Sequence, residues 1–323
     1  YMPRHYGLIN FGEPDINKVN SGETINVEFT KTLRKVQIPI VDAYMSATKK
    51  TIGGGIICVP CGYGKTVIAL NILARLKKKT LIVVHKGFLM NQWKERISFF
   101  LNDVNIGTIQ GKTVDIINKD IVLGMLQSIS MKDYPEYTFD DFGMVIFDEC
   151  HHLSAEVFSQ ALAKVSPKYL LGLSATPKRK DGLSKVFKWY LGDAVYTIKK
   201  RGVEDVDVRC ISFDPKNHTD SDKYNKEIHN YRGKINMAQM INNICAYKPR
   251  TKYIIKILKS LIKEGRKILI LSDRREHLRV IKDYLDKKKY CSGYYLGGMK
   301  QSELKKSEEK QVLLATYSMA SEG

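Results

Sequence analysis

The stretch "IICVPCGYGKT", Ile56 to Thr66, decides how this chain folds. A short apolar run precedes a glycine-rich turn, and Lys65 and Thr66 open an amphipathic segment, "TVIALNILARLKK". A buried strand, a glycine-rich turn and a helix in this order bring backbone amides to a helix amino terminus, where phosphate groups bind. The stretch therefore predicts an α/β fold and a triphosphate site.

The turn itself carries the residue types that a triphosphate needs. Gly62 and Gly64 let the backbone amides curl around the phosphates, Lys65 reaches the terminal phosphates, and Thr66 can hold magnesium. Val59 stands where the strict pattern G-x-x-x-x-G-K-[ST] has its first glycine. Because strand, turn and helix are all present, we favour a nucleotide site over a chance loop.

Outward from this stretch, apolar runs alternate with amphipathic segments such as "FLMNQWKERISFFL". The runs have the continuous, β-rich character of strands that are covered on both faces. They are "IIC", "TLIVVH", "DIVLG", "MVIFDE" and "YLLGLSA". This alternation predicts a doubly wound parallel sheet over residues 31–199, preceded by an amino-terminal extension at 1–30.

The alternation breaks over residues 200–248, which are polar and hold one candidate strand, "VDVRCISF". We interpret this segment as a linker or a small insertion. Within it, "NKEIHNYRGK" supplies basic and aromatic residues that suit either a grip on nucleic acid or a solvated helix. The alternation resumes over 249–323, with "KILILS" as a strand, so a second sheet domain is expected.

The chain has 323 residues and a formal net charge of +19. An excess of this size favours a nucleic-acid partner over a merely solvated lysine-rich surface. No apolar run approaches the roughly 18 residues that span a bilayer, and the amino terminus lacks the apolar core of a signal peptide. We therefore expect a soluble, intracellular protein without a membrane partner, in the nucleus or the cytoplasm, or in a viral factory or virion if the protein is viral.

A second polar cluster ends the apolar run in "MVIFDECHH", Met144 to His152. A phosphate loop needs an acid at a neighbouring strand end to hold magnesium, and Asp148 fits that role. Glu149 is placed to polarise the attacking water. The cysteine and two histidines that follow could instead bind zinc, but further ligands at metal-binding spacing are not evident. We therefore predict catalytic acids here.

These motifs together resemble superfamily 2 helicases of the D-E-x-H branch. "VPCGYGKT", "DECH" and "SATP" are similar to motifs I, II and III, and "LRKVQ" is similar to the element ahead of motif I. Further matches follow in the family order: "LIVVHKGFLMNQW" for motif Ia, "LGMLQSIS" for Ib, "KILILSDR" for IV and "LLATYSMASEG" for V. The resemblance implies two RecA-like domains built on doubly wound parallel sheets.

Within the superfamily, the chain is most similar to the xeroderma pigmentosum group B helicase, phage recombination helicases and transcript-release helicases of large DNA viruses. "LRKVQ", "DECHH" and "GLSATPKRKDGL" carry this similarity. A composition rich in Lys, Ile and Asn is compatible with an AT-rich viral genome, and a viral origin is a hypothesis.

The resemblance also assigns roles to individual residues. The implied catalytic residues are Lys65, Asp148 and Glu149, and the implied magnesium ligands are Thr66 and Asp148. The implied nucleotide-binding residues are Arg34, Gln37, Gly62, Tyr63, Gly64, Lys65 and Thr66, with Gln37 reading adenine. The implied coupling residues are His151, Ser174 and Thr176, and the implied nucleic-acid contacts are Lys86, Gln127, Ser128 and Thr316.

The chain departs from the family pattern at its end. Motif V is cut at Gly323, and motif VI, which supplies an arginine finger, is absent. We therefore expect a fragment whose second sheet is incomplete at the carboxyl end and whose hydrolysis depends on the missing part. The start at Tyr1, without an initiator Met, likewise leads us to expect further residues upstream.

The resemblance implies an ATP-dependent DNA helicase or translocase that uses ATP and magnesium and serves transcription, repair or recombination machinery. Two alternatives stay open. One is an RNA helicase, and the other is a clamp or scaffold that binds ATP and nucleic acid without hydrolysis.

Overall fold

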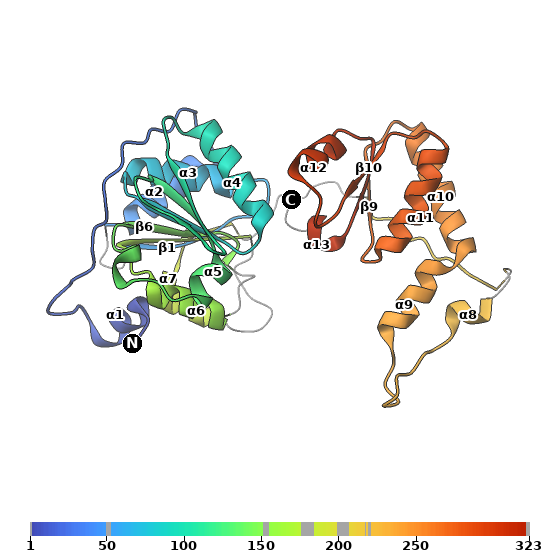
Figure 1. Cartoon of the computed structure of the whole chain (residues 1–323), viewed down its shortest axis with the longest axis horizontal. Helices are drawn as coiled ribbons and strands as arrows, with labels where there is room; N and C mark the ends of the chain where they lie inside the picture. The colour runs from blue at the N-terminus through green and yellow to red at the C-terminus, as the bar shows by residue number, and fades with distance from the viewer. Residues whose placement is uncertain are drawn as a thin grey trace. The chain divides into compact units, whose positions relative to one another are not determined.

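The computed structural model describes residues 2–49, 53–150, 155–175, 184–198, 207–216, 218 and 221–320. The chain divides into two compact units, Tyr1–Asp205 and Val206–Gly323 (Figure 1). Each unit has its own sheet, and the two are described separately.

The first unit is built on an eight-stranded sheet in the order β4-β3-β5-β2-β6-β7-β1-β8. Its strands are β1 Gly54–Cys58, β2 Thr80–Val84, β3 Ile106–Gln110, β4 Thr113–Asp115, β5 Ile121–Met125, β6 Met144–Phe147, β7 Tyr169–Ser174 and β8 Ala194–Thr197. All neighbours pair in parallel except β3 and β4, which are antiparallel. The five predicted strands are confirmed. Sequence patterns missed β3, β4 and β8, which flank the central strands.

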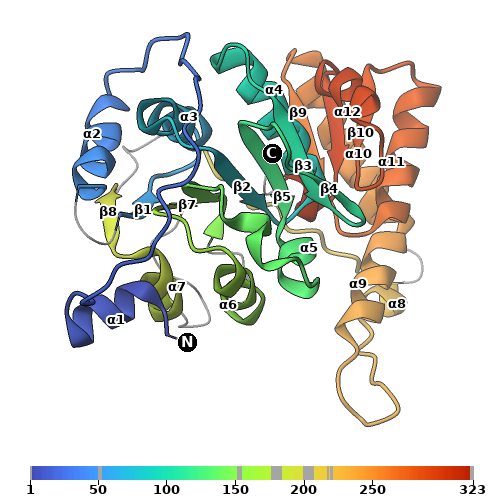
Figure 2. The same cartoon turned by 60° about the vertical axis from the view of Figure 1, so that its left-hand side comes forward.

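Helices cover both faces of this sheet, as Figures 1 and 2 show. One face packs against α2 Ile38–Ala47, α3 Lys65–Leu76 and α4 Gly87–Phe100. The other face packs against α5 Leu126–Met131, α6 Ala155–Lys164 and α7 Ser184–Leu191. Burial on both sides explains why every residue of β1, β2 and β6 is buried and why these strands read as unbroken apolar runs.

The amino-terminal extension packs along this unit. Helix α1, Arg4–Phe11, lies against α7, and the rings of Tyr6 and Trp189 meet edge to face with centroids 5.4 Å apart. Further along, Ile25 and Val27 are buried in the same core as α2 and α3. The extension therefore contributes apolar surface to the first unit.

The second unit holds a three-stranded parallel sheet in the order β10-β11-β9. Its strands are β9 Ile268–Leu271, β10 Ser292–Tyr295 and β11 Val312–Ala315. Its helices are α8 Ser221–Asn225, α9 Met237–Ala246, α10 Lys248–Lys263, α11 Arg275–Lys287, α12 Gln301–Glu308 and α13 Tyr317–Ala320. The core joins apolar residues of α10 and α11 to β11, and the predicted parallel-sheet α/β fold is confirmed.

The strand predicted in "VDVRCISF" is wrong. Residues 207–213 form no strand, and Val206 lies outside the described residues. Val208 and Ile211 are 83% and 54% exposed. Apolar alternation stabilises a strand only when a neighbouring strand receives it, and within the described residues this segment has none. Phe213, at its end, packs into an aromatic cluster instead.

Candidate nucleotide site

The glycine-rich turn joins β1 to α3. Gly62 and Gly64 have φ values of 86° and 80°, in the left-handed region that glycine adopts without strain. A Cβ atom on Gly64 would lie 2.6 Å from Nε2 of Gln37, so a side chain at this position would displace the Gln37 amide. Helix α3 begins directly afterwards at Lys65, which places its amino terminus at the turn.

Arg34 and Gln37 hold the turn from outside. The guanidinium Nη2 of Arg34 donates to the carbonyl of Gly62 at 3.0 Å, and Nε2 of Gln37 donates to the carbonyl of Tyr63 at 2.9 Å. Oε1 of Gln37 accepts from the Arg34 backbone N–H at 3.0 Å, and Gln37 is only 2% exposed. The amide of Gln37 therefore braces the phosphate loop, and its reading of adenine stays a prediction.

The acids after β6 reach the phosphate loop. One oxygen of the Glu149 carboxylate lies 2.7 Å from Nζ of Lys65, and both side chains are largely buried. Glu149 has a φ of 47°, a left-handed conformation that is uncommon for a residue with a Cβ. Such a conformation costs free energy and is retained where the surroundings impose it, and here it accompanies the contact with Lys65.

Asp148 accepts a hydrogen bond through each of its carboxylate oxygens. Its Oδ2 accepts a hydrogen bond of 2.8 Å from the indole Nε1 of Trp93, and its Oδ1 accepts from the Glu149 backbone N–H at 3.0 Å. Burial raises the pKa of Asp148 to about 6, with the charge of Glu149 adding to the rise, while the Trp93 hydrogen bond and the Lys65 charge oppose it. Sequence reasoning missed Trp93, although it ends the motif Ia stretch.

Asp148 and Thr66 suit a magnesium ion. Carboxylate and hydroxyl oxygens are the ligands that magnesium prefers, and both residues lie at the ends of elements that meet at the phosphate loop. The raised pKa of Asp148 also shows that its ionised form is poorly solvated, which a nearby cation would offset. The predicted ligand set is therefore chemically consistent with magnesium.

Of the predicted coupling residues, the structure describes one. Ser174 ends β7, is 2% exposed, and accepts a backbone hydrogen bond of 3.0 Å from Val59 through its carbonyl oxygen. It therefore ties β7 to the strand end that precedes the phosphate loop. His151 and Thr176 lie outside the described residues.

Three predicted nucleic-acid contacts lie near one another, after the neighbouring strands β2 and β5. Lys86 precedes α4, and Gln127 in α5 donates from Nε2 to the carbonyl of His85 at 3.3 Å. Ser128 accepts from the Gly111 backbone N–H at 3.0 Å. Thr316 belongs to the second unit, where it is 8% exposed. Their contact with nucleic acid stays a prediction.

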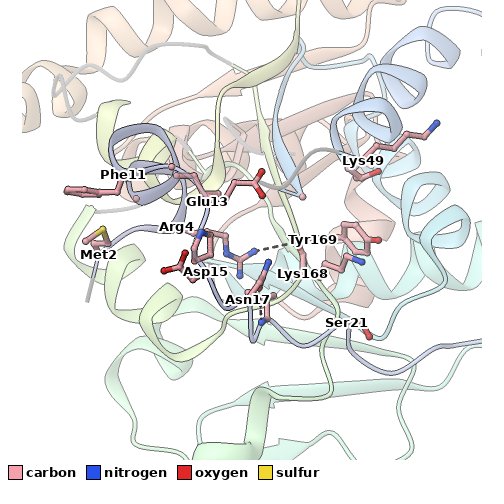
Figure 3. A pocket seen from close by; sticks show the side chains of 17 residues that line it. Met2, Arg4, Phe11, Glu13, Asp15, Asn17, Ser21, Lys49, Lys168 and Tyr169 are labelled. Carbon is pink, nitrogen blue, oxygen red and sulfur yellow. Dashed lines mark hydrogen bonds between the residues drawn. The ribbon is translucent and has the colours of Figure 1, made fainter.

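A separate cavity of about 1160 Å³ opens beside the amino-terminal extension (Figure 3). Arg4, Glu13 and Asp15 line it on one side, and Lys168 and Tyr169 line it on the other. Lys168 and Tyr169 lie where β7 begins, whereas ligands of parallel sheets bind where strands end. This cavity therefore lies at the amino-terminal ends of the parallel strands, whereas the phosphate loop lies at their carboxyl-terminal ends.

The geometry of the phosphate loop agrees with the family comparison. Residues 30–179 match the family described as Type III restriction enzyme, res subunit. The chain resembles the superfamily 2 helicases. The match covers every described part of the predicted nucleotide site in the first unit, from Arg34 to Glu149.

Individual helicases extend the similarity. The chain is 37% identical over 327 residues to a mimivirus protein provisionally named ATP-dependent RNA helicase L396, covering 100% of this chain and 62% of that protein. It is 35% identical over 179 residues to DNA 3'-5' translocase XPB2 of Sulfurisphaera tokodaii, covering 54% of this chain and 37% of that protein. The chain thus spans less than two thirds of both relatives.

A solved helicase structure supports the fold alone. The helicase domain of Pyrococcus furiosus Hef superposes with a TM-score of 0.50 at 16% identity, covering 88% of this chain and 86% of that chain.

A search of the described helices for a membrane-spanning segment found none with the required length and apolar character.

Proposed function

We propose that this helicase couples ATP hydrolysis to movement along DNA. The observation that carries the proposal is the meeting of Lys65, Glu149 and Asp148 at one end of the sheet, with Lys65 and Glu149 in direct contact. A cation that binds phosphate and a carboxylate that activates water are two of the groups that phosphoryl transfer to water uses.

The Lys65–Glu149 pair gives the site a switch. A triphosphate bound in the loop would compete with Glu149 for the ammonium of Lys65, because both ligands are anionic. Once Lys65 turns to phosphate, the Glu149 carboxylate is released to accept a proton from the attacking water. Asp148, held by Trp93 and by the backbone of Glu149, keeps its position during this exchange. Magnesium, when bound, would neutralise phosphate charge beside Asp148.

DNA is the preferred substrate in this proposal. The net charge of +19 suits a polyphosphate, but it does not separate DNA from RNA. The relatives bear both kinds of name, since one is a DNA translocase and the other is provisionally an RNA helicase. The "LRKVQ" and "DECHH" elements favour DNA, because they resemble the corresponding motifs of duplex-DNA translocases.

Steady-state ATP hydrolysis tests the proposal. The chain and the full-length protein should be assayed without polymer and with single-stranded DNA, duplex DNA and RNA, beside Lys65→Ala and Glu149→Gln. Lys288→Ala, an exposed lysine of the second unit, serves as the matched control. For the full-length protein, we expect DNA to stimulate hydrolysis and both site variants to abolish it, whereas the control keeps it.

Other outcomes would redirect the proposal. Stimulation by RNA alone would assign the helicase to RNA. Tight binding of ATP and DNA by the full-length protein, without turnover under any condition, would contradict the motor and support a clamp.

A further inference from the structure

A β-hairpin arm, defined here as residues 226–236, lies between α8 and α9. The backbone N–H of Asn236 donates to the carbonyl of Ile228 at 2.6 Å, and that of Asn230 donates to Lys234 at 2.8 Å. His229 and Ile235 form an antiparallel bridge between these bonds. Both views of the molecule show the chain between α8 and α9 projecting away from the helices of the second unit (Figures 1 and 2).

The tip of the arm is ordered by its own hydrogen bonds. Oδ1 of Asn230 accepts from the backbone N–H groups of Arg232 and Lys234 at 2.9 and 3.1 Å, and Gly233 adopts a φ of 70°. Tyr231 is 90% exposed, with the Arg232 guanidinium 5.1 Å from its ring centroid. The tip therefore presents an aromatic ring and a cation together, held in place before any partner binds.

The base of the arm is anchored to the second unit. An aromatic cluster joins the segment before α8 to α8 and α10, and its members are Phe213, His218, Tyr224, Tyr247 and Tyr253. At the other end of the arm, the side chain of Asn236 accepts from the Gln239 backbone N–H at 3.1 Å and caps α9. One end of the arm thus continues into the aromatic cluster, and the other continues directly into the capped helix α9.

Charge and exposure point to a polyanion. Lys226, Arg232 and Lys234 are exposed on the arm, and its one acid, Glu227, lies 3.5 Å from Nε2 of His229. Stacking of a base on an exposed ring, with basic groups beside it, is the usual way in which proteins hold unpaired nucleic-acid strands. The Tyr231 ring is almost wholly exposed, so it is accessible to a base.

We propose that the arm binds an unpaired nucleic-acid strand by stacking Tyr231 on a base, with Arg232 and Lys234 beside the adjoining phosphates. The inference rests on the proposed function only in taking nucleic acid as the polymer. Bases of every kind carry a flat face, so the contact is expected to be independent of sequence. It assigns residues 226–236 a role in substrate binding.

Exposed apolar residues on helix α9 suggest an alternative partner for this region, another protein surface. Met237 and Ile241, on that helix, are 60% and 38% exposed, and apolar exposure also suits a protein surface. The basic residues favour nucleic acid for the tip, because they would have to be desolvated against an apolar partner.

Binding of single-stranded oligonucleotides that carry 2-aminopurine at successive positions tests the arm. Fluorescence quenching reports stacking, and titration reports affinity. We expect Tyr231→Ala to abolish the arm-dependent quenching and to weaken binding by about 5- to 100-fold. Tyr231→Phe keeps the ring and should stay within about twofold of the unaltered chain. Tyr137→Ala removes a tyrosine of the first unit that is 75% exposed, and it should change nothing.

The opposite results separate this inference from the proposed function. Quenching and affinity that are unchanged in Tyr231→Ala would overturn the arm's role, and DNA-stimulated hydrolysis could then stand alone. Equal weakening in Tyr231→Ala and Tyr137→Ala would also overturn it. A third result would also overturn it: the chain self-associates, Met237→Asp abolishes this association, and Tyr231→Ala leaves strand binding intact. The arm would then serve a protein contact.

Discussion

At the scale of single residues, the site is held by contacts between motifs that lie far apart in the chain. Trp93 donates to Asp148 across 55 positions, and Gln37 braces Tyr63 across 26. Trp93, Asp148 and Gln37 are all buried. A hydrogen bond to a charged group, such as the one from Trp93 to the Asp148 carboxylate, contributes more in such surroundings than at the surface. The phosphate loop and the predicted catalytic acid Asp148 are therefore positioned by residues outside the predicted catalytic set.

Asp148→Asn should remove a pH-dependent cost of folding together with a predicted magnesium ligand, and its amide can accept only one of the two N–H bonds that the carboxylate accepts. The folded-state pKa of about 6 lies above the ordinary value of 3.8, so ionising this carboxyl costs stability. That cost is absent below pH 3.8, grows as the pH rises and is complete above pH 6. In urea unfolding, the stability of Asp148→Asn relative to the unaltered chain should therefore rise by about 1–3 kcal/mol between pH 4 and pH 7.5. The exposed Asp140→Asn is the control, and an equal gain in both variants would contradict the argument.

At the scale of elements, the turn between β1 and α3 depends on two glycines for different reasons. Both have a positive φ, but a Cβ on Gly62 would meet nothing within 4 Å, whereas one on Gly64 would collide with Gln37. The start of α3 is therefore set by a close approach as well as by backbone conformation.

The pair Gly62→Ala and Gly64→Ala separates these two effects. Gly62→Ala should lose only the left-handed backbone preference, roughly 1–2 kcal/mol. Gly64→Ala should lose more, because the Arg34 and Gln37 brace must also shift. Unfolding of both variants without nucleotide measures the difference, and equal losses would show that the brace adapts without cost.

At the scale of the whole molecule, the charge of +19 is spread over the chain, and binding to nucleic acid should be dominated by phosphate contacts. If about six or more phosphates are neutralised, affinity should fall roughly a thousandfold or more between 50 and 200 mM salt. Lys86→Ala should reduce the slope of log affinity against log salt by about one, and Lys288→Ala should leave it unchanged. A flat salt dependence would count against a backbone-tracking motor.

The sequence by itself determined the α/β class, the five central strands and the phosphate loop, because each depends on local patterns. An unbroken apolar run, a glycine-rich turn and an amphipathic helix are visible within a few neighbouring residues. Strands β3, β4 and β8 escaped prediction, since they pair at or near the sheet edges and lack a full apolar run.

Only the tertiary structure decided which residues meet. The contact of Trp93 with Asp148 joins helix α4 to the end of β6, and the contact of Lys65 with Glu149 joins the start of α3 to the same strand end. Sequence spacing does not encode either contact. The segment 207–213 shows the converse case, since its apolar alternation found no neighbouring strand and formed no sheet. Local patterns select elements, but a strand's partner and a carboxylate's surroundings are set by residues brought near through folding.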